Sequence, residues 1–376
     1  MAHTSKMGLI VNPIAGMGGR VGLKGTDGKE ILAKARELGA TPVSPARTVE
    51  ALQAIIPIAD QIELVTCPSE MGEEEAVKCG LHPTVIAGIN RGETSATDTK
   101  NAARIMLDSK IDLLLFAGGD GTARDICTSI DQRLPALGIP AGVKIHSAAF
   151  AVNPRRAGEL AVKFLQGEAP LREAEVMDID EQAFRKGRLS AELYGYLKVP
   201  YERESVQSAK SASFMTPDET ASQDLIAQYV VEKMTDDCYY ILCPGTTVKA
   251  VADKLGIVKT LLGVDLVHKG SLVGSDLNEE QLLGLIDRKK VKIVVSPIGR
   301  QGFIFGRGNP QLSPEVIRNV GRENILIIAT QSKLSSIGLG RPLLVDTGDE
   351  ETDRMLSGYM RVITGYNEEA VVRISS

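Results

Sequence analysis

Tryptophan is absent from this chain of 376 residues, and all aromatic residues together make up only 4% of it. Proteins that bind single-stranded nucleic acid without sequence preference stack bases on aromatic side chains, so such a platform is not expected here. The chain also lacks an excess of basic residues, since its formal net charge is -5. Nucleic-acid binders carry a concentrated basic surface, and therefore no nucleic-acid partner is expected.

Cysteine is scarce: the chain has five cysteines, widely spaced and without the spacing of a zinc knuckle. An odd number of scattered cysteines is typical of reduced thiols in a cytosolic protein. Residues 1–6 are polar and lack the hydrophobic segment of a signal peptide. No apolar run approaches the roughly 18 residues of a membrane span. The sequence therefore predicts a cytoplasmic protein that does not bind a membrane.

Short apolar runs alternate with helical patterns in the first half of the chain. Strands are expected at residues 7–11, 62–66, 84–87, 111–117 and 136–139, and helices at 30–38, 97–108 and 125–130. This alternation predicts a parallel sheet with helices on both faces. The predicted fold class is α/β, with a doubly wound Rossmann-like domain over residues 1–167. A mostly β second domain is expected over residues 168–376.

The most informative motif follows the apolar run 113–117, where Gly118, Gly119, Asp120, Gly121 and Thr122 lead into a helical segment. Glycines at the end of a strand let the backbone turn tightly and approach a ligand. The free amides of the next helix favour an anion such as phosphate, and Thr122 would add a hydroxyl donor. Asp120 would repel phosphate directly, so it suits a catalytic base or a carboxylate that reaches phosphate through a divalent cation. The alternative is a tight turn in which Asp120 only caps the helix.

A second glycine-rich loop closes the first expected strand and contains Asn12, Gly16 and Gly18. The carboxyl ends of parallel strands meet at one edge of a sheet, where ligands bind in open α/β folds. We therefore expect Asn12 to hydrogen-bond a nucleotide and the glycines to admit it. Asp27, further along the loop, could add a carboxylate to a magnesium site. The simpler interpretation is that Asn-Pro starts a turn.

Lys144 and His146 lie just past the strand expected at residues 136–139. Lys144 could neutralise phosphate as a point charge. His146 could shuttle a proton, although a single histidine is as readily a packed or surface residue.

The second half of the chain repeats the order of strand, glycine, hydroxyl and helix at Gly245, Thr246 and Thr247. This segment predicts a second helix start that favours an anion, or else a threonine that caps the helix. Asp265 and Arg300 could complete the pocket, and Arg300 would suit a phosphate.

These motifs resemble those of a known superfamily. Residues 118–122 resemble the Gly-Gly-Asp-Gly-Thr signature of NAD kinases, diacylglycerol kinases and phosphofructokinases. Residues 11–19 and 137–142 are similar to two further motifs of these families, and residues 245–247 loosely resemble a segment that NAD kinases use against the dinucleotide. The chain looks most like the ATP-NAD kinase-like branch that includes the acetoin-catabolism protein X group.

The resemblance implies a kinase that uses ATP or polyphosphate to phosphorylate a hydroxyl of NAD or NADH. It implies that Asp120 is the base or electrostatic helper, that Mg²⁺ bridges the donor phosphates with Asp120 as a candidate ligand, and that the protein is a homo-oligomer. It also implies that the last strands of the second domain could return to the first domain. NAD kinases carry an Asn-Glu pair after a strand of the second domain, where this chain has Tyr-Leu-Lys-Val-Pro at residues 196–200. A polyol, a lipid head group or another nucleotide therefore stays open as the acceptor, as does a non-catalytic nucleotide-binding regulator.

Overall fold

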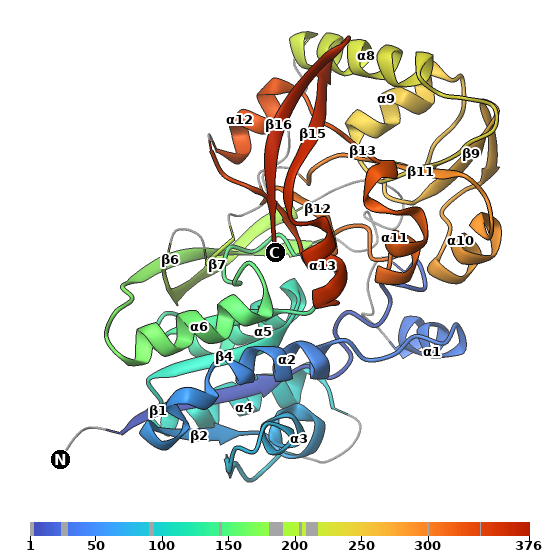
Figure 1. Ribbon diagram of the computed structural model, residues 1–376. Helices are drawn as coiled ribbons and strands as arrows, with labels where there is room; N and C mark the ends of the chain where they lie inside the picture. The colour runs from blue at the N-terminus through green and yellow to red at the C-terminus, as the bar shows by residue number, and fades with distance from the viewer. Residues whose placement is uncertain are drawn as a thin grey trace. The chain divides into compact units, whose positions relative to one another are not determined.

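The computed structural model describes residues 4–23, 29–89, 94–142, 145–179, 191–202, 205–207, 217–298, 301–338 and 340–376 (Figure 1). The chain forms two compact units. Among the described residues, the first unit contains those up to Met17 and those from Lys29 to Gln207. The second contains residues 18–23 and everything from Pro217 onward. Within these ranges no helix is both long enough and apolar enough to cross a membrane.

The first unit is built on a five-stranded parallel sheet with the strand order β3-β2-β1-β4-β5. The strands are β1 (Ser5–Val11), β2 (Ile62–Thr66), β3 (Thr84–Val85), β4 (Leu113–Gly118) and β5 (Ala136–Pro140). The helices are α1 (Lys29–Glu37), α2 (Ser44–Gln53), η1 (Ile56–Gln61), η2 (Ser69–Met71), α3 (Glu73–Lys78), α4 (Ala96–Asp108), α5 (Asp120–Ile130) and α6 (Pro154–Leu165). Because the strand order reverses between β1 and β4, the predicted doubly wound Rossmann-like arrangement is confirmed.

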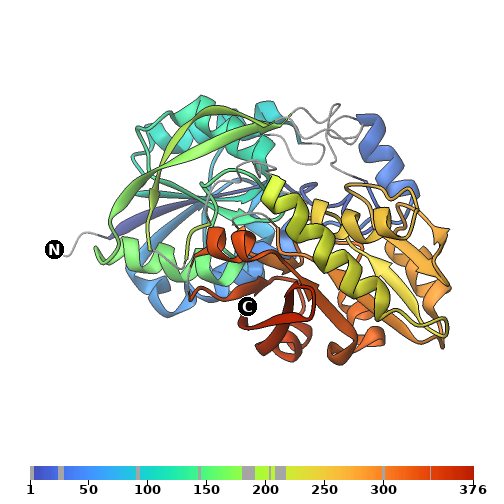
Figure 2. The ribbon, with the colours of Figure 1, turned by 90° about the horizontal axis from the view of Figure 1, so that it is seen from above.

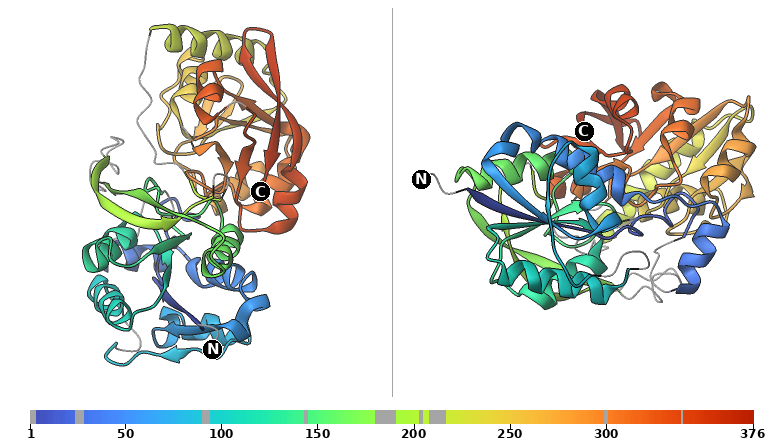
Figure 3. Two further views of the ribbon diagram at one scale, coloured as in Figure 1. Left: turned by 90° about the vertical axis from the view of Figure 1, so that its left-hand side faces the viewer. Right: turned by 90° about the horizontal axis from the view of Figure 1, so that it is seen from below.

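Strand β4 is buried along its whole length because helices cover both faces of the sheet. Leu113 and Leu115 share a core cluster with residues of α2 and α6, whereas Leu114 and Phe116 share one with residues of α4 and α5. Figure 3 (right) shows the blue helix α2 and the teal helices α4 and α5 on opposite sides of the strands. This burial on two faces explains why the strand is a continuous apolar run rather than an alternating one.

A two-stranded antiparallel sheet of β6 (Leu171–Ile179) and β7 (Ala191–Pro200) belongs to the first unit. Its buried side chains Val176 and Leu197 lie in the same core cluster as Ile126 of α5. Figure 2 shows the two strands running beside each other as a long green pair. The first unit therefore extends past residue 167, where the sequence placed the boundary, because this pair completes the apolar cover of α5.

The second unit carries the larger sheet, of nine strands in the order β10-β9-β8-β11-β13-β15-β16-β14-β12. The strands are β8 (Tyr239–Leu242), β9 (Asp265–His268), β10 (Ser271–Gly274), β11 (Val291–Val295), β12 (Phe303–Phe305), β13 (Ile325–Ile328), β14 (Leu343–Val345), β15 (Gly358–Gly365) and β16 (Glu368–Ser375). The helices are α8 (Pro217–Glu232), α9 (Thr246–Lys254), α10 (Glu279–Ile286), α11 (Pro314–Val320), η4 (Arg322–Asn324), α12 (Gln331–Ile337) and α13 (Glu350–Leu356).

The last strands of the chain stay in the sheet of the second unit, which corrects the expectation that they could return to the first. β15 and β16 pair antiparallel with each other, as the long red pair in Figure 1 shows. β15 also pairs with β13 and β16 with β14, so both outer edges of the pair are bonded within the same sheet.

Candidate active site

Three loops meet at the carboxyl edge of the first sheet. They follow β1, β4 and β5, and the strand order reverses between β1 and β4. Ligands of open α/β sheets bind in the crevice at this switch point. The backbone N–H groups of Ala141 and Gly142 both donate to the carbonyl of Gly118 (3.0 Å each), which holds the β5 loop against the central motif.

Asp120 is the first residue of α5 and lies at the centre of these loops. Its Oδ2 accepts from the backbone N–H of His146 (2.8 Å), and its Oδ1 accepts from that of Ser147 (2.9 Å). Only 7% of Asp120 is exposed to solvent. The carboxylate is therefore held in one orientation by two charge-assisted hydrogen bonds, which are stronger than bonds between neutral groups.

The imidazole of His146 lies beside this carboxylate, with Nδ1 at 3.4 Å from Oδ2 of Asp120, and only 1% of the side chain is exposed. The side chain of His146 is thus a buried neighbour of Asp120, and its role as a proton shuttle stays a prediction. The two hydrogen bonds that hold the Asp120 carboxylate form a clamp, to which His146 contributes its backbone amide.

Ser147 was not predicted to belong to the site. Its Oγ accepts from the backbone N–H of Met177 in β6 (2.9 Å), and its carbonyl accepts from Nε2 of Gln207 (2.6 Å). The loop that clamps Asp120 is thus anchored on two further segments. Its place directly after His146, a predicted site residue, was a signal, but its hydrogen bond to Asp120 joins segments that are distant in the sequence.

Asn12 and Thr122, both predicted to contact a nucleotide, bond to each other. Nδ2 of Asn12 donates to Oγ1 of Thr122 (3.0 Å), and Oδ1 of Asn12 accepts from the backbone N–H of Ile14 (3.3 Å). This pair ties the β1 loop to the first turn of α5.

Three glycines of the site leave no room for a Cβ, because neighbouring atoms approach them closely. A Cβ on Gly118 would overlap Thr122, and one on Gly142 would lie 2.8 Å from Cα of Gly119. Gly16 has a φ of +82° and faces the carbonyl of Ala141, which a Cβ there would overlap. Gly121 lies in the first turn of α5.

Of the other predicted residues, five belong to the second unit and three lie outside the described residues. Gly18, Gly245, Thr246, Thr247 and Asp265 belong to the second unit. Asp27, Lys144 and Arg300 lie outside the described residues.

Asp265 was expected to complete the ligand pocket, but it is a fully buried structural residue. Its oxygens accept from the N–H and Oγ1 of Thr260 and from the N–H of Asp276 (2.7 Å each), and Nζ of Lys259 lies 3.6 Å away. These bonds join the turn before β9 to the turn after β10, so they stabilise the fold around this pair of strands.

The cysteines do not provide a nucleophile near neutral pH. Burial raises the pKa of Cys67 and of Cys243 to about 12. Because the thiolate is the reactive form, these thiols are inert and structural.

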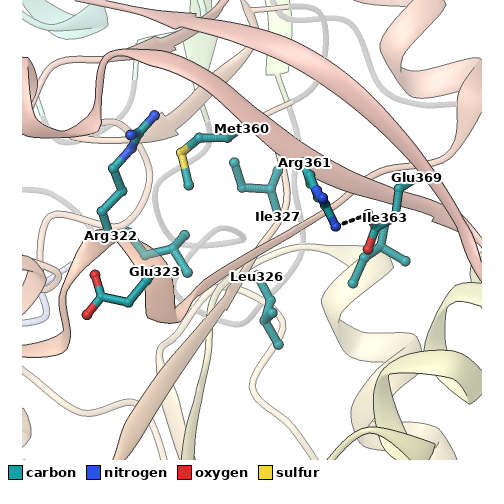
Figure 4. A pocket seen from close by; sticks show the side chains of 9 residues that line it. Arg322, Glu323, Leu326, Ile327, Met360, Arg361, Ile363 and Glu369 are labelled. Carbon is teal, nitrogen blue, oxygen red and sulfur yellow. Dashed lines mark hydrogen bonds and ion pairs between the residues drawn. The ribbon is translucent and has the colours of Figure 1, made fainter.

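An open pocket of about 470 Å³ lies in the second unit, along β13, β15 and β16 (Figure 4). Leu326, Ile327 and Ile363 form its apolar part, and Arg361 and Glu369 on its rim form an ion pair (3.4 Å). Arg322 and Glu323, which precede β13, also line it. The pocket therefore includes none of the residues predicted for the site.

The fold and the loop geometry define an α/β protein with a candidate site at the carboxyl edge of its first sheet. Residues 7–169 match the ATP-NAD kinase N-terminal domain, and residues 235–374 match the ATP-NAD kinase C-terminal domain. The chain belongs to the ATP-NAD kinase family, and membership makes it an NAD kinase-like phosphotransferase.

Other comparisons add little. No curated protein matches the chain. A solved UDP-N-acetylglucosamine 2-epimerase is 8% identical over 93% of this chain and 84% of its own, with a TM-score of 0.24. A putative UDP-N-acetylglucosamine 2-epimerase from Listeria monocytogenes is 11% identical over 92% and 79%, with the same TM-score of 0.24. Likenesses this weak carry no inference.

Proposed function

We propose that the protein transfers a phosphoryl group from ATP or polyphosphate to a hydroxyl of NAD or NADH at the carboxyl edge of its first sheet. The observation that supports this most is the Asp120 carboxylate, fixed by two backbone amides where the β1, β4 and β5 loops meet. Family membership supports the reaction class, and the position of the loops matches the place where open α/β sheets bind ligands.

Asp120 acts as the general base or electrostatic helper for the acceptor hydroxyl. Each oxygen of a carboxylate can accept about two hydrogen bonds, and the backbone amides of residues 146 and 147 use one on each oxygen. The remaining acceptor positions can bind a hydroxyl within the roughly 2.6–3.2 Å that proton transfer requires. Because the carboxylate is oriented beforehand, little freedom is lost when the acceptor binds.

The start of α5 supplies the donor side of the site. Its N-cap is Gly119, which has no side chain that could cap the first amides of the helix. Such amides stabilise phosphate oxygens and the charge that develops on them during transfer.

Mg²⁺ fits this site as an ion held mainly by the substrate. Among the described residues, no group of three or more His, Cys, Asp or Glu side chains could hold a metal ion. Mg²⁺ commonly binds through one or two carboxylates together with nucleotide phosphates, so Asp120 would be the protein ligand. The ion would neutralise charge on the transferred phosphoryl group.

The test is a turnover assay with ATP or polyphosphate, Mg²⁺ and a panel of NAD, NADH, nucleosides, polyols and a diacylglycerol. NADP or NADPH is expected from the wild type and not from Asp120→Asn. Asparagine offers one acceptor oxygen where two backbone amides donate, so this variant also breaks the clamp. Ser147→Ala is the matched control, because it loosens the same loop at Met177 and leaves the carboxylate in place. Nucleotide binding without transfer to any acceptor would instead identify a regulator.

A further inference from the structure

The β15–β16 pair in the second unit has one face in the core and one face toward solvent. Directly opposed residues of an antiparallel pair point to the same side of the sheet. Val362 and Ile374 point to one side and lie in the core of the unit. The other side, which we call the hairpin face, consists of Tyr359, Arg361, Ile363, Glu369, Val371 and Arg373. Ile363 is buried in a core cluster with residues of α8, whereas the other five residues are exposed.

The hairpin face is more apolar than a solvent-facing side of a sheet usually is. Such sides normally carry polar side chains, yet Tyr359 is 72% exposed and Val371 is 69% exposed. Tyr359 lies opposite Arg373, and Val371 lies opposite Arg361, so each pair joins an apolar side chain to a basic one. Tyrosine and arginine are enriched where proteins contact each other. The composition of the face is therefore that of a contact surface.

The pocket along β13, β15 and β16 continues this face. It shares Arg361 and Glu369 with the face, and Figure 4 shows them on one side of the pocket with Arg322 and Glu323 on the other. Nη2 of Arg322 donates to the carbonyl of Tyr359 (3.0 Å), which ties the two parts of the surface together. All residues of the face and the pocket belong to the second unit, so this unit forms the surface by itself.

The charges on this surface have both signs. They belong to three arginines, Arg322, Arg361 and Arg373, and two glutamates, Glu323 and Glu369. A partner of one strong sign would be repelled by one of the two sets, because contacting surfaces need complementary potentials. A second copy rotated about a two-fold axis presents the same two sets in reverse order, so arginines of each copy can face glutamates of the other. The surface is thus complementary in charge to itself.

We propose that the hairpin face and the adjoining pocket form a two-fold contact with a second copy of this chain. In this contact Tyr359 and Val371 are removed from water, and arginines pair with glutamates across the axis. The contact does not depend on phosphoryl transfer, since a catalytically silent protein would associate in the same way.

Sedimentation velocity of the full-length protein over a range of concentrations tests the contact. The wild type is expected to sediment as a dimer or a larger even-numbered oligomer. Arg361→Glu is expected to raise the dissociation constant at least about a hundredfold and to halve the mass, since like charges then face each other across the axis. Tyr359→Ala is expected to raise it about thirtyfold, because an aromatic residue is lost from the contact.

The double variant Arg361→Glu with Glu369→Arg exchanges the two charges. It is expected to return the dissociation constant to within about tenfold of the wild type, because opposite charges face each other again. A merely structural role of the Arg361–Glu369 ion pair would not make the mass follow this exchange. Both side chains are in solvent contact, so the far-UV circular dichroism of all variants is expected to match that of the wild type.

Lys290→Glu is the matched control. Lys290 forms an exposed ion pair with Asp237 in the same unit (2.7 Å), away from the hairpin face. Reversing this charge is expected to leave the dissociation constant within about twofold of the wild type.

Two results would overturn the contact. One is an oligomer whose mass Arg361→Glu and Tyr359→Ala leave unchanged, which would place the contact on another surface. The other is a wild type that stays monomeric at every concentration, which would leave the first unit of the same chain or a different protein as the occupant of the face. Neither result bears on turnover at Asp120, and Asp120→Asn is expected to sediment as the wild type does.

Discussion

The carboxyl edges of the two sheets carry opposite charges. In the first unit, the carboxylate of Asp120 accepts from two backbone amides of the β5 loop. In the second unit, the ammonium group of Lys333 donates to two hydroxyls at the ends of β8 and β11. Both edges join parallel strands to a helix start without a side-chain cap. The same backbone geometry thus presents a base in one unit and a cluster of donors in the other.

The two edges also use glycine for different reasons. Gly118 has no room for a Cβ, because Thr122 of the following turn occupies that space. Gly245 has ample room but adopts a φ of +122°, which side chains rarely allow. The first edge is therefore closed and tightly packed at its glycine, whereas the second is open.

The largest effect is expected for Asp120→Ala. Loss of the carboxylate should lower turnover about a thousandfold, as for removal of a general base. It should also lower the free energy of unfolding by about 3 kcal/mol, because two buried amides lose their acceptor. Turnover and chemical denaturation measure the two effects. Full stability with no turnover would show that the clamp contributes nothing to the fold.

Gly118→Ala and Gly245→Ala test the contrast between the two glycines. Gly118→Ala is expected to cost about 3 kcal/mol of unfolding free energy, since the added methyl group overlaps Thr122. Gly245→Ala should cost only about 1–2 kcal/mol, the strain of an unfavourable φ. Denaturation curves of both variants check this order, and equal costs would remove the distinction between a closed and an open edge.

The stability of the two units should change with pH in opposite directions. Burial raises the pKa of Glu75 in α3 to about 7. The folded first unit then binds this proton more tightly than the unfolded chain does, so its stability should fall by about 2 kcal/mol as pH rises from 4.5 to 7. Burial lowers the pKa of Lys259 below its usual 10.5, so stability of the second unit should rise as pH increases towards that value.

Hydrogen exchange, followed separately in the two units, measures the slope of stability against pH in each unit. Glu75→Gln should flatten the slope of the first unit and leave that of the second unchanged. A first unit that gains stability between pH 4.5 and 7 would contradict the assignment of Glu75.

The smallest expected effect is a gain in stability. Gly284 is an exposed residue inside α10, and a Cβ there would meet nothing within 4 Å. Gly284→Ala should therefore stabilise the second unit by about 1 kcal/mol through helix propensity. Thermal unfolding checks it, and a loss of stability would show that α10 needs flexibility at this position.

Much of the first sheet could be predicted from the sequence because its strands are continuous apolar runs. The strand predicted at residues 62–66 matches β2, and the run at 111–117 matches β4 within two residues. α5 begins at Asp120 rather than at residue 125, because its first turn consists of the motif residues that were assigned to a loop. α6 was missed although Asn153 caps it and Pro154 opens it, which is a recognisable start.

The partners of Asp120 could not be predicted, because the amides of residues 146 and 147 lie more than 25 positions away and carry no side-chain signature. The contacts of Lys333 with Thr247 and Ser296 could not be predicted for a similar reason, since they exist only once β8, β11 and β13 are side by side. Asp265 shows the opposite error: a carboxylate near a strand end resembled a site residue, but every one of its bonds described above serves the fold.

The central claim is that Asp120, held by its clamp, promotes phosphoryl transfer to the dinucleotide. The most direct test is the rate of NADP or NADPH formation by the wild type, Ser147→Ala and Asp120→Asn in one assay. Clear turnover is expected of the wild type, a loss of less than about tenfold in Ser147→Ala, and near-complete loss in Asp120→Asn. Equal rates in Asp120→Asn and Ser147→Ala would contradict it, because the carboxylate would then serve the loop and not the reaction.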